Sequence, residues 1–127
     1  MFEATQNLIL PHLVLNKLKR DTHGALVSFI GTVRGYSIEG KRVLFVKCEG
    51  DNEVVERELR KLGDDLHSRW QLEDVALCHR LGRIEVGETI FVAAIAAAHR
   101  QEAFEACQYA IDRVKERVRL REVVEGA

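Results

Sequence analysis

Residues 89–118 read TIFVAAIAAAHRQEAFEACQYAIDRVKERV, and this stretch decides the fold. Up to residue 98 nearly every position is apolar, and the side chains as far as Ile95 are mostly β-branched, aromatic or alanine. Such a run is typical of a strand that is covered on both faces. Beyond Glu102 the apolar residues recur at spacings of three and four, which predicts one face of a helix: Phe104, Cys107, Ile111, Val114 and Val118. We therefore predict a buried strand, a short junction and a long helix.

His99 and Arg100 form the junction between that strand and that helix. A helix N-terminus carries unpaired backbone N–H groups, which together with a cationic side chain can hold an anion. Lys115 lies near the other end of the helix, and Arg34 directly follows a second apolar strand, ALVSFIGTV at 25–33. Each cation alone is typical of a solvated position. Together they favour the binding of phosphate or carboxylate groups.

The length of the predicted helix limits how these cations can act. His99 and Lys115 are sixteen positions apart, so a straight helix would separate them by roughly 20 to 24 Å. One small ligand cannot contact both, so either the helix breaks or two chains share a site. We predict the second arrangement, a two-fold homodimer with composite sites. In each site Lys115 and Arg34 of one chain face His99 and Arg100 of the other.

The composition is that of an ordinary globular protein and gives no overall attraction to nucleic acid or membrane. The 127 residues carry a net charge of -1, with 46% apolar and 31% charged residues. We predict one domain over residues 1–127. No apolar run is long enough to span a membrane and the N-terminus has no secretory signal pattern, so we expect a cytoplasmic location.

Three cysteines, at positions 48, 78 and 107, stand in apolar or strand-like surroundings. They are widely spaced and outside any CxxC pattern, so we interpret them as buried structural thiols rather than nucleophiles or metal ligands. No set of neighbouring residues supplies the three ligands that a zinc site requires. The dipeptide His79-Arg80 repeats the junction dipeptide within a predicted strand, and we interpret it as structural.

The remaining chain alternates strands and helices. A first strand within 1–10 precedes a short helix at 12–20, and the strand at 25–33 is expected to form a hairpin with one at 42–47. Asp51 or Asn52 begins a helix that extends to Trp70, whose charged face, including Asp64 and Asp65, is interpreted as solvated surface. A strand at 74–81, a turn-rich link with a short strand at 82–88 and an extended or loosely ordered tail after Val118 complete the chain. The order predicts an α+β fold with a largely antiparallel sheet and helices covering one side.

Two blocks of this sequence resemble the catalytic large subunit of molybdopterin synthase, the MoaE family: GALVSFIGTVRG, and HRLGRIEVGETIFVAAIAAAHRQEAFEACQYAIDRVKER. The similarity extends from about residue 24 to about residue 117. It implies an α/β hammerhead fold and the addition of two sulfurs to cyclic pyranopterin monophosphate, which gives the dithiolene of molybdopterin. It also implies a small ubiquitin-like partner that carries sulfur as a thiocarboxylate on its C-terminal Gly-Gly, within a heterotetramer. The large subunit of this family needs no metal or organic cofactor.

The resemblance also implies roles for individual residues. Arg34 and Arg100 are expected to bind the anionic substrates, and His99 to contact substrate or transfer a proton. Lys115 matches the principal catalytic lysine, next to the thiocarboxylate. Phe29 and Ile111 are expected to line the pocket.

The segment after Lys115 departs from the family pattern, being divergent and shorter. The family continues into a Pro-Phe-Trp-Lys-like segment with a second functional lysine, whereas the corresponding residue here is Glu122. Arg119 or Arg121 is expected to supply the positive charge at this place. The departure favours an alternative: a non-catalytic protein of the same fold that binds the small subunit or a pterin phosphate. A third possibility is an unrelated α+β module for anion binding or protein interaction.

Overall fold

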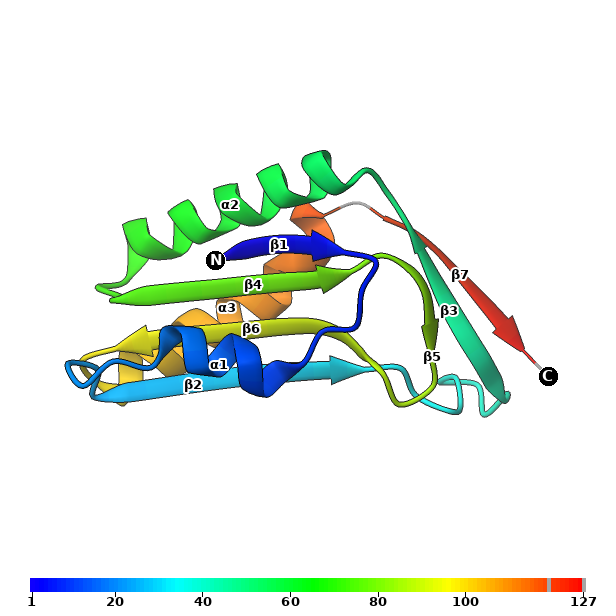
Figure 1. Ribbon diagram of the computed structural model, residues 1–127, viewed down its shortest axis with the longest axis horizontal. Coiled ribbons are helices and arrows are strands. Elements are labelled where there is room, and N and C mark those ends of the chain that lie inside the picture. Colours follow the sequence, from blue (N-terminus) through cyan, green and yellow to red (C-terminus); the bar gives the residue numbers. More distant parts are fainter. Residues whose placement is uncertain (119, 127) are drawn as a thin grey trace.

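The computed structural model describes residues 1–118 and 120–126. In chain order its elements are β1 (Phe2–Thr5), α1 (Pro11–Leu18), β2 (Ala25–Thr32), β3 (Val43–Glu49), α2 (Asn52–Arg69), β4 (Asp74–Arg80), β5 (Gly82–Glu85), β6 (Thr89–Ala97), α3 (Arg100–Arg117) and β7 (Arg121–Gly126). Four strands form a main sheet in the order β1-β4-β6-β2, and three form a second sheet in the order β5-β3-β7. The second sheet stands at one end of the main sheet, on the right in Figure 1. Every pairing except β1 with β4 is antiparallel, which confirms the predicted fold class.

Strand β6 lies inside the main sheet and is covered on both faces, as predicted. Ala93, Ile95 and Ala97 belong to the larger hydrophobic core, under α2 and α3. Val92 and Ala94 belong to a smaller core under α1. Figure 1 shows α1 in front of the sheet and α3 behind it. The prediction that helices cover one side was therefore wrong. An apolar strand needs cover on each face, and the short α1 supplies the second cover with Val14 and Leu18.

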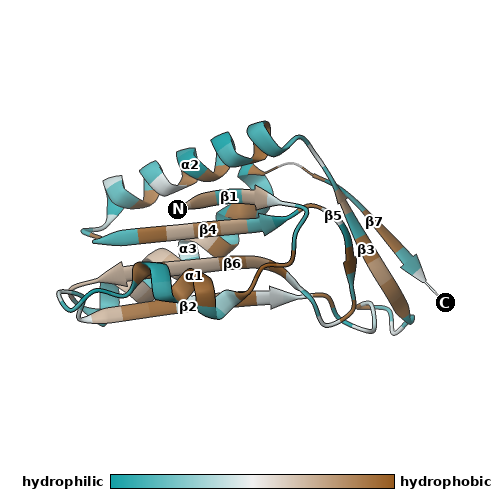
Figure 2. Ribbon diagram, in the orientation of Figure 1, coloured by the Kyte–Doolittle hydropathy of each residue, from teal (hydrophilic) through white to brown (hydrophobic). Residues whose placement is uncertain are grey.

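The predicted hairpin of the second and third strands was also wrong. β2 pairs with β6 from Ala25 opposite Ala97 to Gly31 opposite Phe91. β3 instead lies between β5 and β7 in the second sheet. Buried and exposed side chains largely alternate along β3, so this strand has one solvated face. It therefore fits the smaller second sheet rather than the main sheet, whose inner strands are covered on both faces. In Figure 2 the strands of the main sheet are mostly apolar, whereas α2 is largely hydrophilic.

Helix α3 is rotated relative to the face predicted from its large apolar residues. Its buried side chains are Ala103, Ala106, Cys107, Ala110 and Val114. Phe104 was predicted to lie on the apolar face of the helix, but it is 59% exposed. The small alanine side chains of α3 allow the helix to pack close to the alanines of β6. The predicted face was chosen from the large apolar residues and left these alanines out. The prediction of a continuous α3, in contrast, is confirmed.

The C-terminal tail is extended, as expected, and it is paired rather than loose. β7 forms an antiparallel ladder with β3, from Arg121 opposite Glu49 to Gly126 opposite Val43. Arg119 lies outside the described residues. Within residues 1–118 and 120–126, no helix is long and apolar enough to cross a membrane.

Asp65 of α2 fixes the C-terminal half of α3. Its carboxylate accepts hydrogen bonds from the Tyr109 hydroxyl (2.7 Å), Arg117 Nη2 (3.0 Å) and Arg69 Nε (3.1 Å). The interpretation of Asp65 as a simple solvated charge was therefore wrong. Since Arg117 lies two positions after Lys115, this carboxylate also holds the turn of helix that carries the candidate catalytic lysine.

Replacement of Asp65 by asparagine is expected to lower the free energy of unfolding at pH 7 by about 1 kcal/mol. The Tyr109 hydrogen bond, helped by Arg69 and Arg117, lowers the pKa of Asp65 below its ordinary value of 3.8. The stabilisation is therefore complete above that value and is lost as the pH falls through the lower, folded-state pKa. Urea unfolding at pH 7 and at acidic pH measures this, with the exposed neighbour Asp64→Asn as control. An equal loss at both pH values would contradict the assignment.

Candidate active site

The two ends of α3 carry the junction residues and the lysine, far from one another. α3 is unbroken from Arg100 to Arg117, with His99 as its N-cap residue. The His99 side chain makes no capping hydrogen bond to the first turn of α3. Lys115 lies in the last turn, about 24 Å along the helix from His99 at 1.5 Å per residue. One small ligand therefore cannot contact both residues in one chain.

Arg34 lies at the same end of the main sheet as Lys115. β2 and β6 are antiparallel, so the end of β2 lies beside the start of β6. α3 follows the end of β6 and packs back over β6 and β2, as Figure 1 shows. The fold therefore gathers Arg34 and Lys115 at one end, and His99 and Arg100 at the other. All four side chains are exposed to solvent.

The two predicted apolar wall residues come from β2 and from α3, which packs over β2 and β6. Phe29 projects to the same face of β2 as Val27, which packs against the larger core. The Phe29 ring lies 3.2 Å from the position that a Cβ on Gly31 would take. Phe29 remains 37% exposed. Ile111 is partly buried against the same core, one helical turn before Lys115. Both residues are therefore available to a ligand held near this end of α3.

The two charged residues at the start of β7 project to opposite faces. Glu122 pairs with Cys48, whose side chain is buried, so Glu122 projects toward the main body of the protein. Arg121 pairs with Glu49 on the outer face, where its Nη1 lies 3.9 Å from Glu49 Oε2. Its side chain is 80% exposed. The predicted role of Arg121 stays a prediction, but its orientation directs it away from the side that Glu122 occupies.

His79 and Arg80 make local contacts that support their structural interpretation, although they lie at the end of β4 rather than in its middle. The buried Arg80 donates to the carbonyls of Gln6 and Arg83, both at 3.2 Å. The His79 ring pairs with the Arg80 carbonyl at 2.8 Å and packs against Phe91. Burial lowers the pKa of His79, an effect that the Arg80 hydrogen bond and the Glu122 charge partly offset.

All three cysteines are buried, as predicted. Burial raises the pKa of Cys48 to about 12 and the pKa values of Cys78 and Cys107 to about 11. Because the thiolate is the reactive form, we expect none of them to react with a thiol reagent at pH 8 in the folded protein. In urea all three should react rapidly. A thiol that reacted at the same rate before and after unfolding would contradict their burial.

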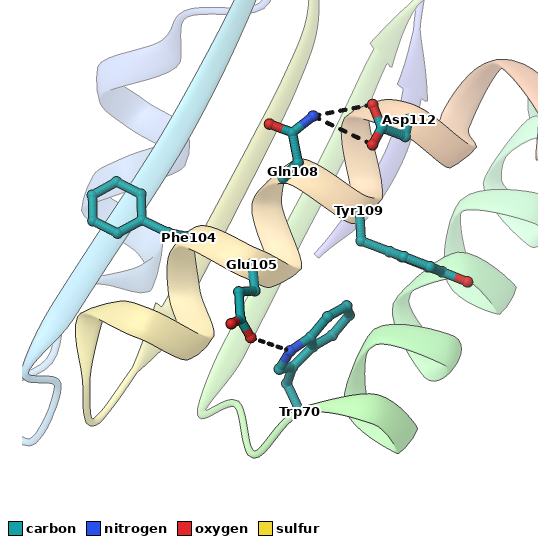
Figure 3. Close-up of a pocket in the computed structure, with 6 residues that line it drawn as sticks. All are labelled: Trp70, Phe104, Glu105, Gln108, Tyr109 and Asp112. Atoms are coloured by element: carbon teal, nitrogen blue, oxygen red, sulfur yellow. Dashed lines mark hydrogen bonds between the residues drawn. The ribbon is translucent and has the colours of Figure 1, made fainter.

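Two hollows of the chain are lined by residues other than the predicted site residues. One, of about 430 Å³, is lined by Trp70, Phe104, Glu105, Gln108, Tyr109 and Asp112. Figure 3 shows the Trp70 indole beside Tyr109, with Phe104 directed away from both. The other, of about 140 Å³, lies beneath α1 and reaches Cys78. Neither of these two hollows includes a predicted site residue, and the four candidate residues Arg34, His99, Arg100 and Lys115 are exposed on the surface of the chain.

The fold and the placement of its cations define a class: an α+β protein with exposed cationic residues at each end of the main sheet. Residues 4–117 match the family model described as MoaE protein. The molybdopterin synthase catalytic subunit of Thermoplasma volcanium is 40% identical over 91% of this chain and 84% of its own. The chain therefore belongs to the MoaE family.

Solved structures agree with this assignment. The crystal structure of molybdopterin synthase from Staphylococcus aureus superposes with a TM-score of 0.92 at 25% identity, covering 99% of this chain and 91% of the other. A chain from a Helicobacter pylori complex of subunits 1 and 2 of molybdopterin-converting factor has a TM-score of 0.79. At 15% identity, with 96% of this chain and 82% of that chain covered, it shares the fold.

Proposed function

We propose that this protein, over residues 1–127, is the catalytic subunit of a cytoplasmic molybdopterin synthase. It adds two sulfurs to cyclic pyranopterin monophosphate to give molybdopterin. The sulfur comes from the thiocarboxylated C-terminus of a small ubiquitin-like subunit. The observation that carries this proposal is the family match over residues 4–117, which includes Arg34, His99, Arg100 and Lys115.

The chemistry of the substrates fits the exposed cations. A phosphorylated pterin and a thiocarboxylate are both anions, and arginine offers them a fixed fork of donors. Arg34 and Arg100 bind these groups, and His99 contacts the substrate or transfers a proton. Lys115 acts next to the thiocarboxylate, where an ammonium group can stabilise developing negative charge or transfer a proton. Phe29 and Ile111 form an apolar wall.

The free edge of β2 supports a composite site between two copies. β2 ends the main sheet, and its other edge meets no strand among the described residues. Ser28, Phe29 and Ile30 are exposed on this strand of eight residues. An open edge of that length is normally covered or paired. Antiparallel pairing of two β2 strands about a two-fold axis would bring the start of one beside the end of the other. The His99-Arg100 junction of one copy then approaches Arg34 and Lys115 of its partner.

Mixing the protein with its thiocarboxylated small partner and cyclic pyranopterin monophosphate tests the proposal. We expect dithiolene product, detected after oxidation as a fluorescent pterin. Omission of the partner and use of a partner without the terminal thiocarboxylate are the controls. Absence of product with the complete mixture would contradict the proposed activity.

A second candidate function is partner or pterin binding without sulfur transfer. Its specific support is Glu122, an anion projecting inward where the family pattern has a second lysine. Tight binding of the thiocarboxylated partner, measured by calorimetry, together with no product in the complete mixture, would favour this function.

A further inference from the structure

His23 lies in the turn before β2, at the end of the main sheet where β6 ends and α3 begins. Its Nδ1 forms a hydrogen bond with Oε2 of Glu73, in the segment before β4. The His23 side chain is only 10% exposed, and that of Glu73 is 32% exposed. These two residues, which we call the His23–Glu73 clasp, therefore join two segments fifty positions apart in sequence.

Both sides of the clasp are attached to the last residues of β6. The Gly24 amide donates to the Ala97 carbonyl at 3.1 Å, and the Glu73 amide donates to the Ala96 carbonyl at 2.8 Å. Gly24 also approaches the chain so closely that a Cβ there would lie 2.0 Å from the Ala98 carbonyl oxygen. A displacement of either segment would therefore displace Ala98, the residue directly before His99.

The buried side of the clasp points into the protein. His23 Nε2 is buried without a hydrogen-bond partner in the described part of the chain. The same holds for Oε2 of Glu102, in the first turn of α3. Buried polar atoms of this kind are rare and generally persist where the surrounding structure holds them for another purpose. Here the bond to Glu73 is the interaction that fixes the imidazole.

We propose that the His23–Glu73 clasp positions the His99-Arg100 junction for anion binding, an inference that rests on the proposed function. His23 is a positioning residue, since it acts through Ala98 and contacts no substrate. In a composite site the clasp of one chain sets the geometry of the anion-binding group offered to its partner. It should therefore govern substrate affinity rather than the chemistry at Lys115.

Steady-state kinetics of His23→Ala test this role. We expect the KM for cyclic pyranopterin monophosphate to rise about tenfold while kcat stays within about twofold of wild type. Glu73→Gln, which keeps an acceptor oxygen, should retain a KM close to wild type, whereas Glu73→Ala should reproduce His23→Ala. His67→Ala, an exposed histidine on α2, is the matched control. An unchanged KM in both alanine variants, or a loss confined to kcat, would overturn the proposal.

Amide hydrogen exchange tests the clasp without requiring activity. In His23→Ala the amides of Gly24 and Glu73 are expected to exchange about tenfold faster, because their local opening becomes easier. The amide of Ala94, in the middle of β6, should keep its wild-type rate. If His23→Ala does not fold, Glu73→Ala provides the same measurement from the other side. Unchanged exchange at both amides would overturn the clasp. Faster exchange in a protein whose wild type forms no product would instead reject only the proposed function.

Discussion

Lys115→Ala is expected to lower the rate of molybdopterin formation by at least about 100-fold, the usual contribution of a positioned acid, base or charge-stabilising group. Lys115 is exposed in the last turn of α3, at the end of the main sheet where Arg34 follows β2. Because the Lys115 side chain is exposed, its truncation should preserve folding and partner binding. Single-turnover measurement with saturating thiocarboxylated partner isolates the sulfur-transfer step.

Two further variants define what Lys115 does. Lys115→Arg keeps the positive charge but cannot transfer a proton at neutral pH, because arginine stays protonated. Recovery of activity in this variant would indicate charge stabilisation, and continued loss would indicate proton transfer. Lys61→Ala is the control, since Lys61 lies on α2 and pairs only with the neighbouring Glu58 at 3.3 Å among the described residues. Unchanged turnover in Lys115→Ala would refute the assignment.

Arg100→Ala is expected to lower kcat/KM by about 10- to 100-fold, as loss of a charge-assisted hydrogen bond to an anion would do. Arg34→Ala should have an effect of similar size, although Arg34 lies at the opposite end of the main sheet. Both side chains are exposed, so neither change should lower the thermal unfolding temperature appreciably. Arg60→Ala, an exposed arginine on α2, is the matched control. Wild-type kinetics in Arg100→Ala would contradict the assignment of the His99-Arg100 junction to the active site.

The sequence was most informative where one physical requirement dominated. β6 had to be covered on both faces, and α3 had a helical period and a favourable charge distribution, so both elements were predicted correctly. The partner of β2 was not predictable in the same way. Strand pairing depends on contacts between residues far apart in sequence. The next strand in sequence, β3, belongs to the second sheet, and β2 pairs with β6 instead. Phe104 was misplaced because alanines, rather than large side chains, form the close contact with β6.

The candidate site was only partly predictable for a similar reason. Helix length alone separated His99 from Lys115, but only the antiparallel register of β2 and β6 places Arg34 at the same end of the main sheet as Lys115. The opposite orientations of Arg121 and Glu122 follow from the β3–β7 register, which no local pattern indicates. His23 gave no sequence signal, since its partner Glu73 is fifty positions away. Asp65 was likewise indistinguishable from its exposed neighbours on α2.

The central claim is that each active site combines Lys115 of one chain with the junction of another. Refolding an equal mixture of Arg100→Ala and Lys115→Ala chains tests it most directly. Random pairing makes half of the dimers mixed, and each mixed dimer contains one undamaged site. The mixture should therefore recover about one quarter of wild-type activity, although each variant alone should retain about one tenth or less. If each site were formed within a single chain, every site would remain damaged, and a mixture no more active than the separate variants would contradict the account.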